Sequence, residues 1–266
     1  MRDASHCINC HRAIDIPNQK FCPTCGQPTP VHRIDWHFLG HELEHSVLHM
    51  DRGVLYSLKE LMLRPGHLIR DYLDGRRANQ VKPLLLIMIT AALVVFLTRY
   101  VAGVGVMDSM ATIGNADGAR INGDIPLELV KMFGAFDAVK EWTNGHFALV
   151  TLLLLPLEAL ALKLAFRRFR ELNYPEWLVI AAFLTVQTFV IWALLVPLQR
   201  WLPQVMAWVS IPIFGYNVFS LVQFFRGYPR WKATLRALFG LGIFMLVSGF
   251  LTLAMVAVVL VMPARG

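Results

Sequence analysis

Four cysteines are the side chains of this sequence whose spacing points most directly to chemistry. They form two Cys-x2-Cys pairs separated by eleven residues, and they are all the cysteines of the chain: Cys7, Cys10, Cys22 and Cys25. Two such pairs present four thiolates to one ion in tetrahedral geometry, and Gly26 lets the backbone turn behind the second pair. The spacing therefore predicts one structural Zn2+ ion in a small ribbon over residues 1–30. A redox-active pair is disfavoured, because no thioredoxin-like βαβ pattern surrounds it.

A second set of candidate metal ligands lies on a helix that we expect to begin after Asp35 and to end near Met50. Within it, His41-Glu42-Leu43-Glu44-His45 matches the HExxH pattern of zinc hydrolases. Two histidines one helical turn apart can share a zinc ion, and the glutamate between them can act as general base on the bound water. His49 or Asp51 is the candidate third ligand. This hypothesis makes the protein a membrane-anchored zinc hydrolase with Glu42 as its catalytic base.

The histidine face of this helix has other interpretations. An apolar stripe recurs at helical spacing on the opposite side and consists of Trp36, Leu39, Leu43, Val47 and Met50. A helix with this pattern can lie on a membrane surface with its histidines toward solvent or headgroups. Because the downstream residues of a metzincin pattern are missing, hydrolysis, a non-catalytic metal role and a plain interfacial helix all stay open.

The elements that must hold these groups follow from composition. Of the 266 residues, 56% are hydrophobic and 16% are charged, which excludes an ordinary soluble domain. We predict an all-α polytopic membrane protein with a small N-terminal zinc ribbon. Five runs are long enough to cross about 30 Å of hydrocarbon. They cover residues 83–102, 146–166, 177–197, 204–224 and 237–262, and form a transmembrane domain over 83–262 with a non-cytoplasmic loop at 103–145. We expect that loop to contain a short amphipathic helix over 126–142, which either lies at the membrane interface or serves as a small sensor or docking element.

The distribution of cations predicts the orientation. Nineteen of the 25 Lys and Arg residues lie before residue 83 or in the segments 163–170 and 226–236. Positive residues gather on the cytoplasmic side of membrane proteins, so we expect a cytosolic N-terminus and a non-cytoplasmic C-terminus. No signal peptide is visible, and thiols reserved for zinc suit a reducing compartment. The expected location is the bacterial inner membrane, with several spans.

Residues 34–82 are expected to form cytosolic, juxtamembrane amphipathic helices. Pro65 can start one helix and Gly75 can end it in a left-handed cap. Its apolar residues Leu68, Ile69, Tyr72 and Leu73 are expected to face the bilayer surface. Five cations are then placed near anionic headgroups, namely Arg64, Arg70, Arg76, Arg77 and Lys82.

Polar residues within the predicted spans are further candidates. Glu158 is the acidic residue that lies well inside a span, and such a group is a functional-site hypothesis by default. The alternative is that Glu158 snorkels toward Lys163 and Arg167. Gln187, Asn217 and Gln223 are expected to form hydrogen bonds between helices.

These motifs, in this order, resemble an uncharacterised family of bacterial inner-membrane proteins that is classed as a domain of unknown function. The resemblance rests on Cys7-x2-Cys10, Phe21-Cys22-Pro23-x-Cys25-Gly26-Gln27, His41-Glu42-x-x-His45, Leu58-Lys59-Glu60-Leu61, Arg64-Pro65-Gly66, Tyr72-x-x-Gly75-x-Arg77 and Lys82-Pro83. It covers about the first third of the chain in detail. It implies an N-terminal zinc ribbon and a polytopic membrane part, and it implies no established activity.

Three functions are therefore expected as alternatives. The first is a non-enzymatic scaffold whose zinc ribbon binds a protein partner and whose basic helices bind anionic lipids. The second is the HExxH hydrolase, and the third is a small-solute or lipid-handling protein that uses Glu158. Nucleic acid is not an expected partner, because Arg2, Arg12, Lys20 and Phe21 do not form a basic stripe. A homo-oligomer is compatible with the sequence.

Overall fold

The computed structural model describes residues 6–14, 20–29, 31–45, 53–78, 80–110, 127–202 and 208–261. Within these ranges the regular secondary structure is helical. Two isolated β-bridges, His6–Ala13 and Phe21–Pro28, belong to the N-terminal cysteine loops. The predicted all-α class is therefore confirmed for the described part of the chain.

Four helices are long and apolar enough to cross a membrane. The first is Pro83–Ala102, which consists of α4 (Pro83–Leu97) and the π-helical turn η1 (Thr98–Ala102). The second is α7 (Phe147–Ala165), and the third is Tyr174–Gln199, which joins α8 (Tyr174–Leu195) to the 3-10 turn η3 (Val196–Arg200). The fourth is α11 (Arg230–Val261). Each corresponds to a predicted span.

The fifth predicted span, 204–224, overlaps α10 (Ser210–Phe224). This helix has 15 residues. At 1.5 Å per residue it extends about 22 Å, which is less than the hydrocarbon thickness of about 30 Å. Residues 203–207, which precede it, lie outside the described part of the chain. Five spans therefore stay a prediction, and four helices meet the length requirement.

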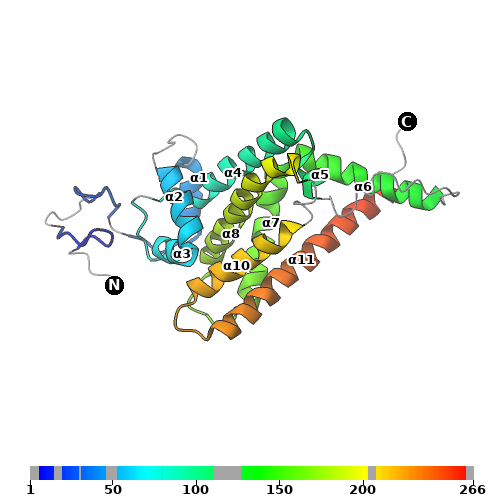
Figure 1. The fold of residues 1–266 in the computed structure, drawn as a ribbon. Coiled ribbons are helices and arrows are strands. Elements are labelled where there is room, and N and C mark those ends of the chain that lie inside the picture. Colours follow the sequence, from blue (N-terminus) through cyan, green and yellow to red (C-terminus); the bar gives the residue numbers. More distant parts are fainter. Residues whose placement is uncertain are drawn as a thin grey trace.

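Helix α8 lies at the centre of the bundle and α11 lies at its edge (Figure 1). In the apolar window of α8, 67% of the residues are buried, against 6% in that of α11. Trp177, Phe183 and Trp192 of α8 are fully buried between α4, α7 and α10. Phe250 and Leu246 of α11 are exposed. A long apolar helix with so little burial marks a face that meets lipid or another protein chain.

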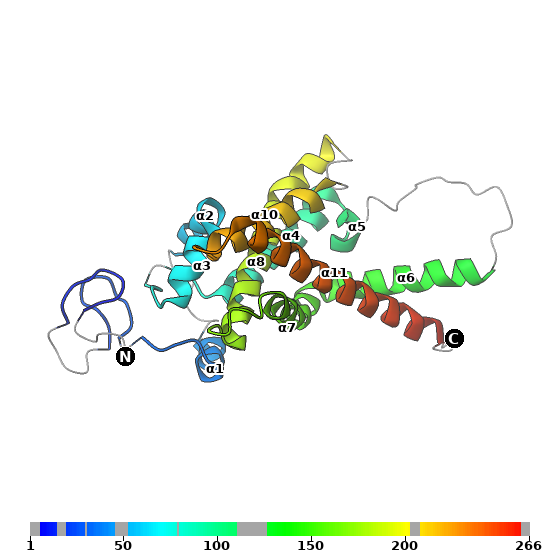
Figure 2. The ribbon, with the colours of Figure 1, turned by 90° about the horizontal axis from the view of Figure 1, so that it is seen from below.

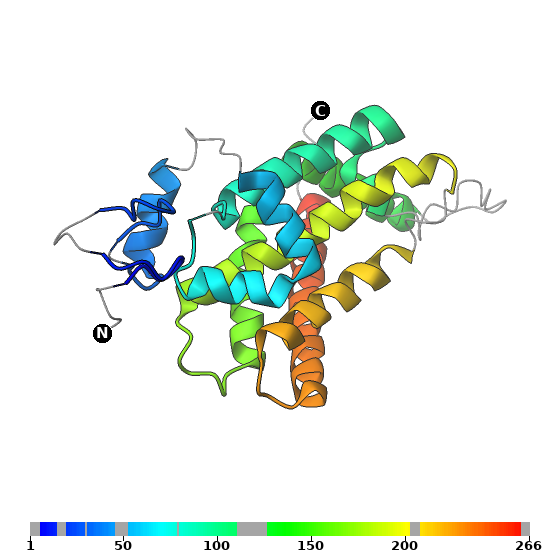
Figure 3. The ribbon, with the colours of Figure 1, turned by 60° about the vertical axis from the view of Figure 1, so that its left-hand side comes forward.

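Helices α2 (Gly53–Leu63) and α3 (Pro65–Leu73) form a hairpin that packs on α8 and α10 (Figure 3). The side chains of Leu68, Ile69, Tyr72 and Leu73 are buried there, and the Tyr72 ring lies edge-on to Phe183 at 5.3 Å. The expectation that these residues face the bilayer surface is therefore wrong. An amphipathic pattern requires an apolar partner, and the neighbouring helices provide one that buries the whole face.

Helix α1 (Trp36–His45) begins where the sequence predicts. The Asp35 carboxylate accepts a hydrogen bond from the Phe38 amide at 2.8 Å, as a helix N-cap does. Phe38 and Leu39 pack against the core, whereas Trp36 is exposed and contacts the Tyr174 ring. The expected continuation to Met50 falls in residues 46–52, outside the described residues.

The predicted amphipathic helix of the long loop is α6 (Leu127–Gly145), preceded by the short α5 (Val106–Met110). Ala135 and Val139 of α6 pack against Val256 near the end of α11 (Figure 2). Lys140 joins α6 to α5 through Asp108 at 2.9 Å. This helix therefore packs on a long apolar helix of the bundle.

Burial of the α3 face generates a stability prediction. Ile69 is fully buried, whereas Leu63, at the end of α2, is 63% exposed. We expect Ile69→Ala to lower the free energy of unfolding by about 2–5 kcal/mol, and Leu63→Ala to change it by less than about 1 kcal/mol. Thermal unfolding of the detergent-purified chain, followed by tryptophan fluorescence, measures both. Equal effects of the two substitutions would place α3 on the bilayer surface after all.

Candidate functional site

The four cysteines converge on one point in the structure. Their sulfur atoms all lie within 4.8 Å of one another. The Cys7–Cys25 and Cys10–Cys22 sulfur pairs are 3.6 Å apart, and no disulfide joins the four residues. A tetrahedral site with Zn–S bonds of about 2.3 Å requires sulfur separations of about 3.8 Å. The residues therefore form a cluster that fits a metal ion of this size.

Each cysteine pair sits in the same kind of backbone turn. The His11 amide donates to the Cys7 carbonyl at 2.8 Å, and the Gly26 amide donates to the Cys22 carbonyl at 2.9 Å. Both His11 and Gly26 have a positive φ, so His11 takes in the first turn the place that glycine takes in the second. Backbone amides of Cys25 and Thr24 hydrogen-bond the Cys22 sulfur and lower the pKa of that thiol to about 6. The second turn thereby favours the thiolate of Cys22, which is the form that binds metal, whereas burial and the neighbouring thiols raise the pKa of Cys10.

Gln27 attaches the cysteine cluster to the α2–α3 hairpin. This side chain is buried, and its amide nitrogen donates to the Gly75 carbonyl at 2.9 Å. Its amide oxygen accepts from the Arg77 backbone amide at 3.0 Å. Gly75 has a positive φ and ends the α3 region as the sequence predicts. The residue directly after the second cysteine turn is therefore bound to the cap of α3.

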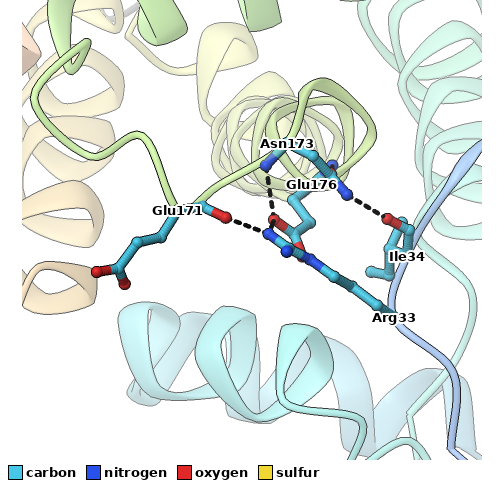
Figure 4. A network of polar contacts seen from close by, with 5 residues as sticks. All are labelled: Arg33, Ile34, Glu171, Asn173 and Glu176. Atoms are coloured by element: carbon cyan, nitrogen blue, oxygen red, sulfur yellow. Dashed lines mark hydrogen bonds and ion pairs between the residues drawn. The ribbon is translucent and has the colours of Figure 1, made fainter.

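A second attachment joins the segment after the ribbon to the start of α8 (Figure 4). Arg33 donates to both carboxylate oxygens of Glu176, at 2.7 and 2.9 Å, and to the Glu171 carbonyl. The hydrogen bond to Glu176 raises the pKa of Arg33. Asn173 and Glu176 also form the capping box of α8, and the Asn173 side chain donates to the Ile34 carbonyl at 2.8 Å. Neither Gln27 nor Arg33 was a predicted site residue.

The HExxH segment is helical, since α1 includes residues 41–45. The side chains of His41, Glu42 and His45, and all of His49, lie outside the described residues. The structure therefore does not test a second metal site, and the hydrolase stays a hypothesis.

The cations predicted to contact headgroups have partners within the protein. Arg64 pairs with Glu60 at 2.6 Å and Arg76 with Asp71 at 3.3 Å. The Arg77 guanidinium lies over the Phe38 and Tyr72 rings. Arg70 lies over Phe224, and burial together with the charge of Arg226 lowers the pKa of Arg70. Lys82 also takes part in an interaction. Lipid contact by these five residues stays a prediction.

The break between α2 and α3 exposes backbone polar groups to α10. Pro65 has no amide hydrogen for the Leu61 carbonyl, and the Gly66 amide donates to the Gln223 side chain at 2.8 Å. The carbonyls at the end of α2 therefore need other donors. The Tyr216 hydroxyl of α10 donates to the Met62 carbonyl at 2.6 Å and lies 3.4 Å from that of Leu61. Side chains of α10 thus satisfy the backbone groups that the proline releases.

Glu158 of α7 and Asn217 of α10 each form a hydrogen bond with a threonine of α8. The Thr185 hydroxyl donates to Glu158 at 3.1 Å, and Asn217 donates to Thr188 at 3.2 Å. Both residues are buried, so the structure places Glu158 between α7 and α8 rather than at the surface beside Lys163. Gln187 of α8 accepts from Ser220 of α10 at 3.0 Å, as expected of a bond between helices.

Part of this architecture matches a known family. Residues 51–95 match the family model described as a protein of unknown function (DUF3667). The matched segment contains α2, α3 and most of α4, and so includes the break at Pro65. No curated protein and no solved structure matches the chain significantly. The match supports the resemblance to an uncharacterised family.

The cysteine geometry predicts the metal content. We expect one zinc ion per chain in detergent-purified protein, and we expect Cys22→Ser to remove it. Atomic emission measures zinc against protein. The His41→Ala/His45→Ala variant separates a ribbon site alone from a ribbon site with a second HExxH site. If the ribbon is the only metal site, this variant keeps its one zinc ion. Two zinc ions that fall to one in this variant would establish a second site, and Glu42→Gln would then test hydrolysis.

The close approach of Gly66 to the backbone of α10 predicts a second effect on stability. A Cβ on Gly66 would lie 2.5 Å from the Gln223 carbonyl carbon and closer still to the Phe224 amide nitrogen. Because both contacts are to backbone, we expect Gly66→Ala to destabilise the protein by about 1–3 kcal/mol. Gly215→Ala on α10, where a Cβ meets no atom within 4 Å, is the matched control. Thermal unfolding of both variants measures the difference, and equal stability would argue against the packing of α3 on α10.

Proposed function

We propose that the protein is a non-enzymatic membrane platform. Its four-cysteine ribbon binds Zn2+ and presents a docking surface for a protein partner on the cytosolic side of the membrane. The observation that supports this proposal is the double attachment of the ribbon region, through Gln27 to the end of α3 and through Arg33 and Ile34 to the start of α8. A small metal-bound element that is held at a defined position suits presentation of a surface.

The charge distribution supports the cytosolic placement. The segment around Arg33 contacts the start of α8, and the α7–α8 and α10–α11 connections contact each other through Phe166 and Phe225, whose ring centroids are 4.4 Å apart. The segments richest in Lys and Arg therefore gather at one end of the bundle, opposite α5 and α6 (Figure 1). By the positive-inside rule this end faces the cytosol.

The docking surface that we propose includes Phe21. This side chain is 59% exposed beside the buried Cys22, although an aromatic ring of this size gains free energy by burial. The neighbouring Pro23 and Thr24 are exposed as well. Aromatic residues are enriched among those that dominate protein interfaces. An exposed ring on a metal-bound turn is therefore a suitable anchor for a partner.

Photo-crosslinking in cells tests the platform. A photoreactive amino acid in place of Thr24 is expected to give a discrete adduct with one partner in the full-length chain. We expect the adduct to disappear with Cys22→Ser, which removes the metal. It should also disappear with Phe21→Ala, which leaves one zinc ion per chain.

The control places the same photoreactive group at Leu55, which is exposed on α2. If adducts form equally from Leu55, or persist in the Cys22→Ser chain, the ribbon is not the docking element. A full zinc content without any adduct at Thr24 would leave the metal site standing and contradict the platform.

A further inference from the structure

Four arginines line an open pocket at the ribbon end of the bundle. The pocket has a volume of about 580 Å3 and is lined by Arg167, Arg168, Arg170 and Arg236. Three of these residues belong to the α7–α8 connection, and Arg236 lies two turns into α11. Figure 3 shows the α7–α8 and α10–α11 connections next to each other at this end. None of the four arginines is among the cations that the sequence assigned to headgroups.

Aromatic side chains hold the two connections together. The Phe169 ring contacts Phe225 at 4.4 Å and meets Tyr228 edge-on at 5.3 Å. The guanidinium carbons of Arg168, from the α7–α8 connection, and Arg236, from α11, lie 6.0 and 5.5 Å from the Tyr228 ring centroid. Stacking on a shared ring limits the motion of both side chains. Two of the four arginines are therefore held on one shared ring between the α7–α8 connection and α11.

The positive charge of the pocket is not neutralised by the described part of the protein. Among the described residues, no carboxylate forms an ion pair with any of the four arginines. One terminal guanidinium nitrogen of Arg236 is buried without a hydrogen-bond partner. Converging like charges repel, and a buried donor without a partner costs free energy. A bound anion would remove the repulsion between the four cations.

The chemistry and position of the pocket indicate which kind of anion it would bind. Guanidinium groups match the oxygen pairs of phosphate through two parallel hydrogen bonds. Arg167 follows the end of α7 at Ala165 by two residues, and Arg170 precedes the start of α8 at Tyr174 by four. The pocket therefore lies where two spans meet the aqueous phase, which is the level of lipid headgroups. Exposed Trp231 near the start of α11 suits the same interface.

We propose that this arginine pocket binds a phosphate group, supplied by the headgroup of an anionic phospholipid. The proposal does not rest on the zinc ribbon or on a protein partner. It assigns the lipid contact to the connections between spans and leaves Arg64 and Arg76 to their ion pairs. A lipid held there would bridge the α7–α8 and α10–α11 connections.

Native mass spectrometry of the full chain in a neutral detergent tests the proposal. Phosphatidylglycerol, phosphatidylcholine and inorganic phosphate are titrated separately. The test variant is Arg167→Gln/Arg170→Gln, since both side chains are exposed and their loss leaves the aromatic framework intact. The control is Arg230→Gln/Lys232→Gln, which removes two exposed charges from the start of α11 outside the pocket lining.

We expect phosphatidylglycerol to bind more tightly than phosphatidylcholine. The test variant should lose affinity for it at least about tenfold, given typical contributions of cations to anionic-lipid binding. The control should change little. Arg236→Lys is a second variant that keeps the charge but not the planar fork, and we expect it to weaken binding as well.

Two results overturn the proposal in different ways. If test and control variants lose affinity equally, or neither does, general surface charge or other residues bind the lipid. If inorganic phosphate binds through the four arginines and phosphatidylglycerol does not, the phosphate chemistry stands and the lipid as its source is wrong.

Discussion

The backbone break at Pro65 is the constraint on which the N-terminal half of the structure depends. In apolar surroundings a carbonyl without a partner costs free energy, and proline leaves the Leu61 carbonyl without its helical donor. Tyr216 supplies a hydroxyl to this region, and Gln223 receives the Gly66 amide. These bonds place the α2–α3 hairpin on α10. The buried face of the hairpin then also packs against α8. The backbone after α3 then binds Gln27 of the ribbon region, with the Gly75 carbonyl as acceptor and the Arg77 amide as donor.

The two attachments of the ribbon region differ in strength. Arg33 is 58% exposed at its side chain, so its ion pair with Glu176 contributes little once solvent screening is counted. Gln27 is buried and bonds to the backbone with both its amide nitrogen and its amide oxygen, and its loss would leave a buried carbonyl and a partly buried amide unpaired. We infer that Gln27 determines where the ribbon sits, and that Arg33 and the Asn173 cap align the segment that follows.

The C-terminal turn of α10 connects the hairpin to the arginine pocket. Gln223 contacts Gly66, Phe224 lies under Arg70, and Phe225 packs against Phe169. Three consecutive residues thus contact α3 on one side and the α7–α8 connection on the other. A lipid in the pocket and a partner on the ribbon would act on the same end of the bundle. The segment that matches the family model includes the α2–α3 hairpin. Its structural role is to join the ribbon region to α10, which hydropathy alone does not reveal.

The sequence by itself determined the features that depend on local spacing. The cysteine pairs, the Asp35 cap, the four long apolar helices and α6 are all readable from residue type and periodicity, because each is set within a few turns of chain. Only the tertiary structure decided which groups these elements pack against and hydrogen-bond. The apolar face of α3 has the same pattern whether it meets lipid or α8, and Gln27 has no local signal for its bonds to Gly75 and Arg77. The arginines of the pocket come from the α7–α8 connection and from α11, far apart in sequence, and they converge because aromatic packing joins that connection to the segment before α11.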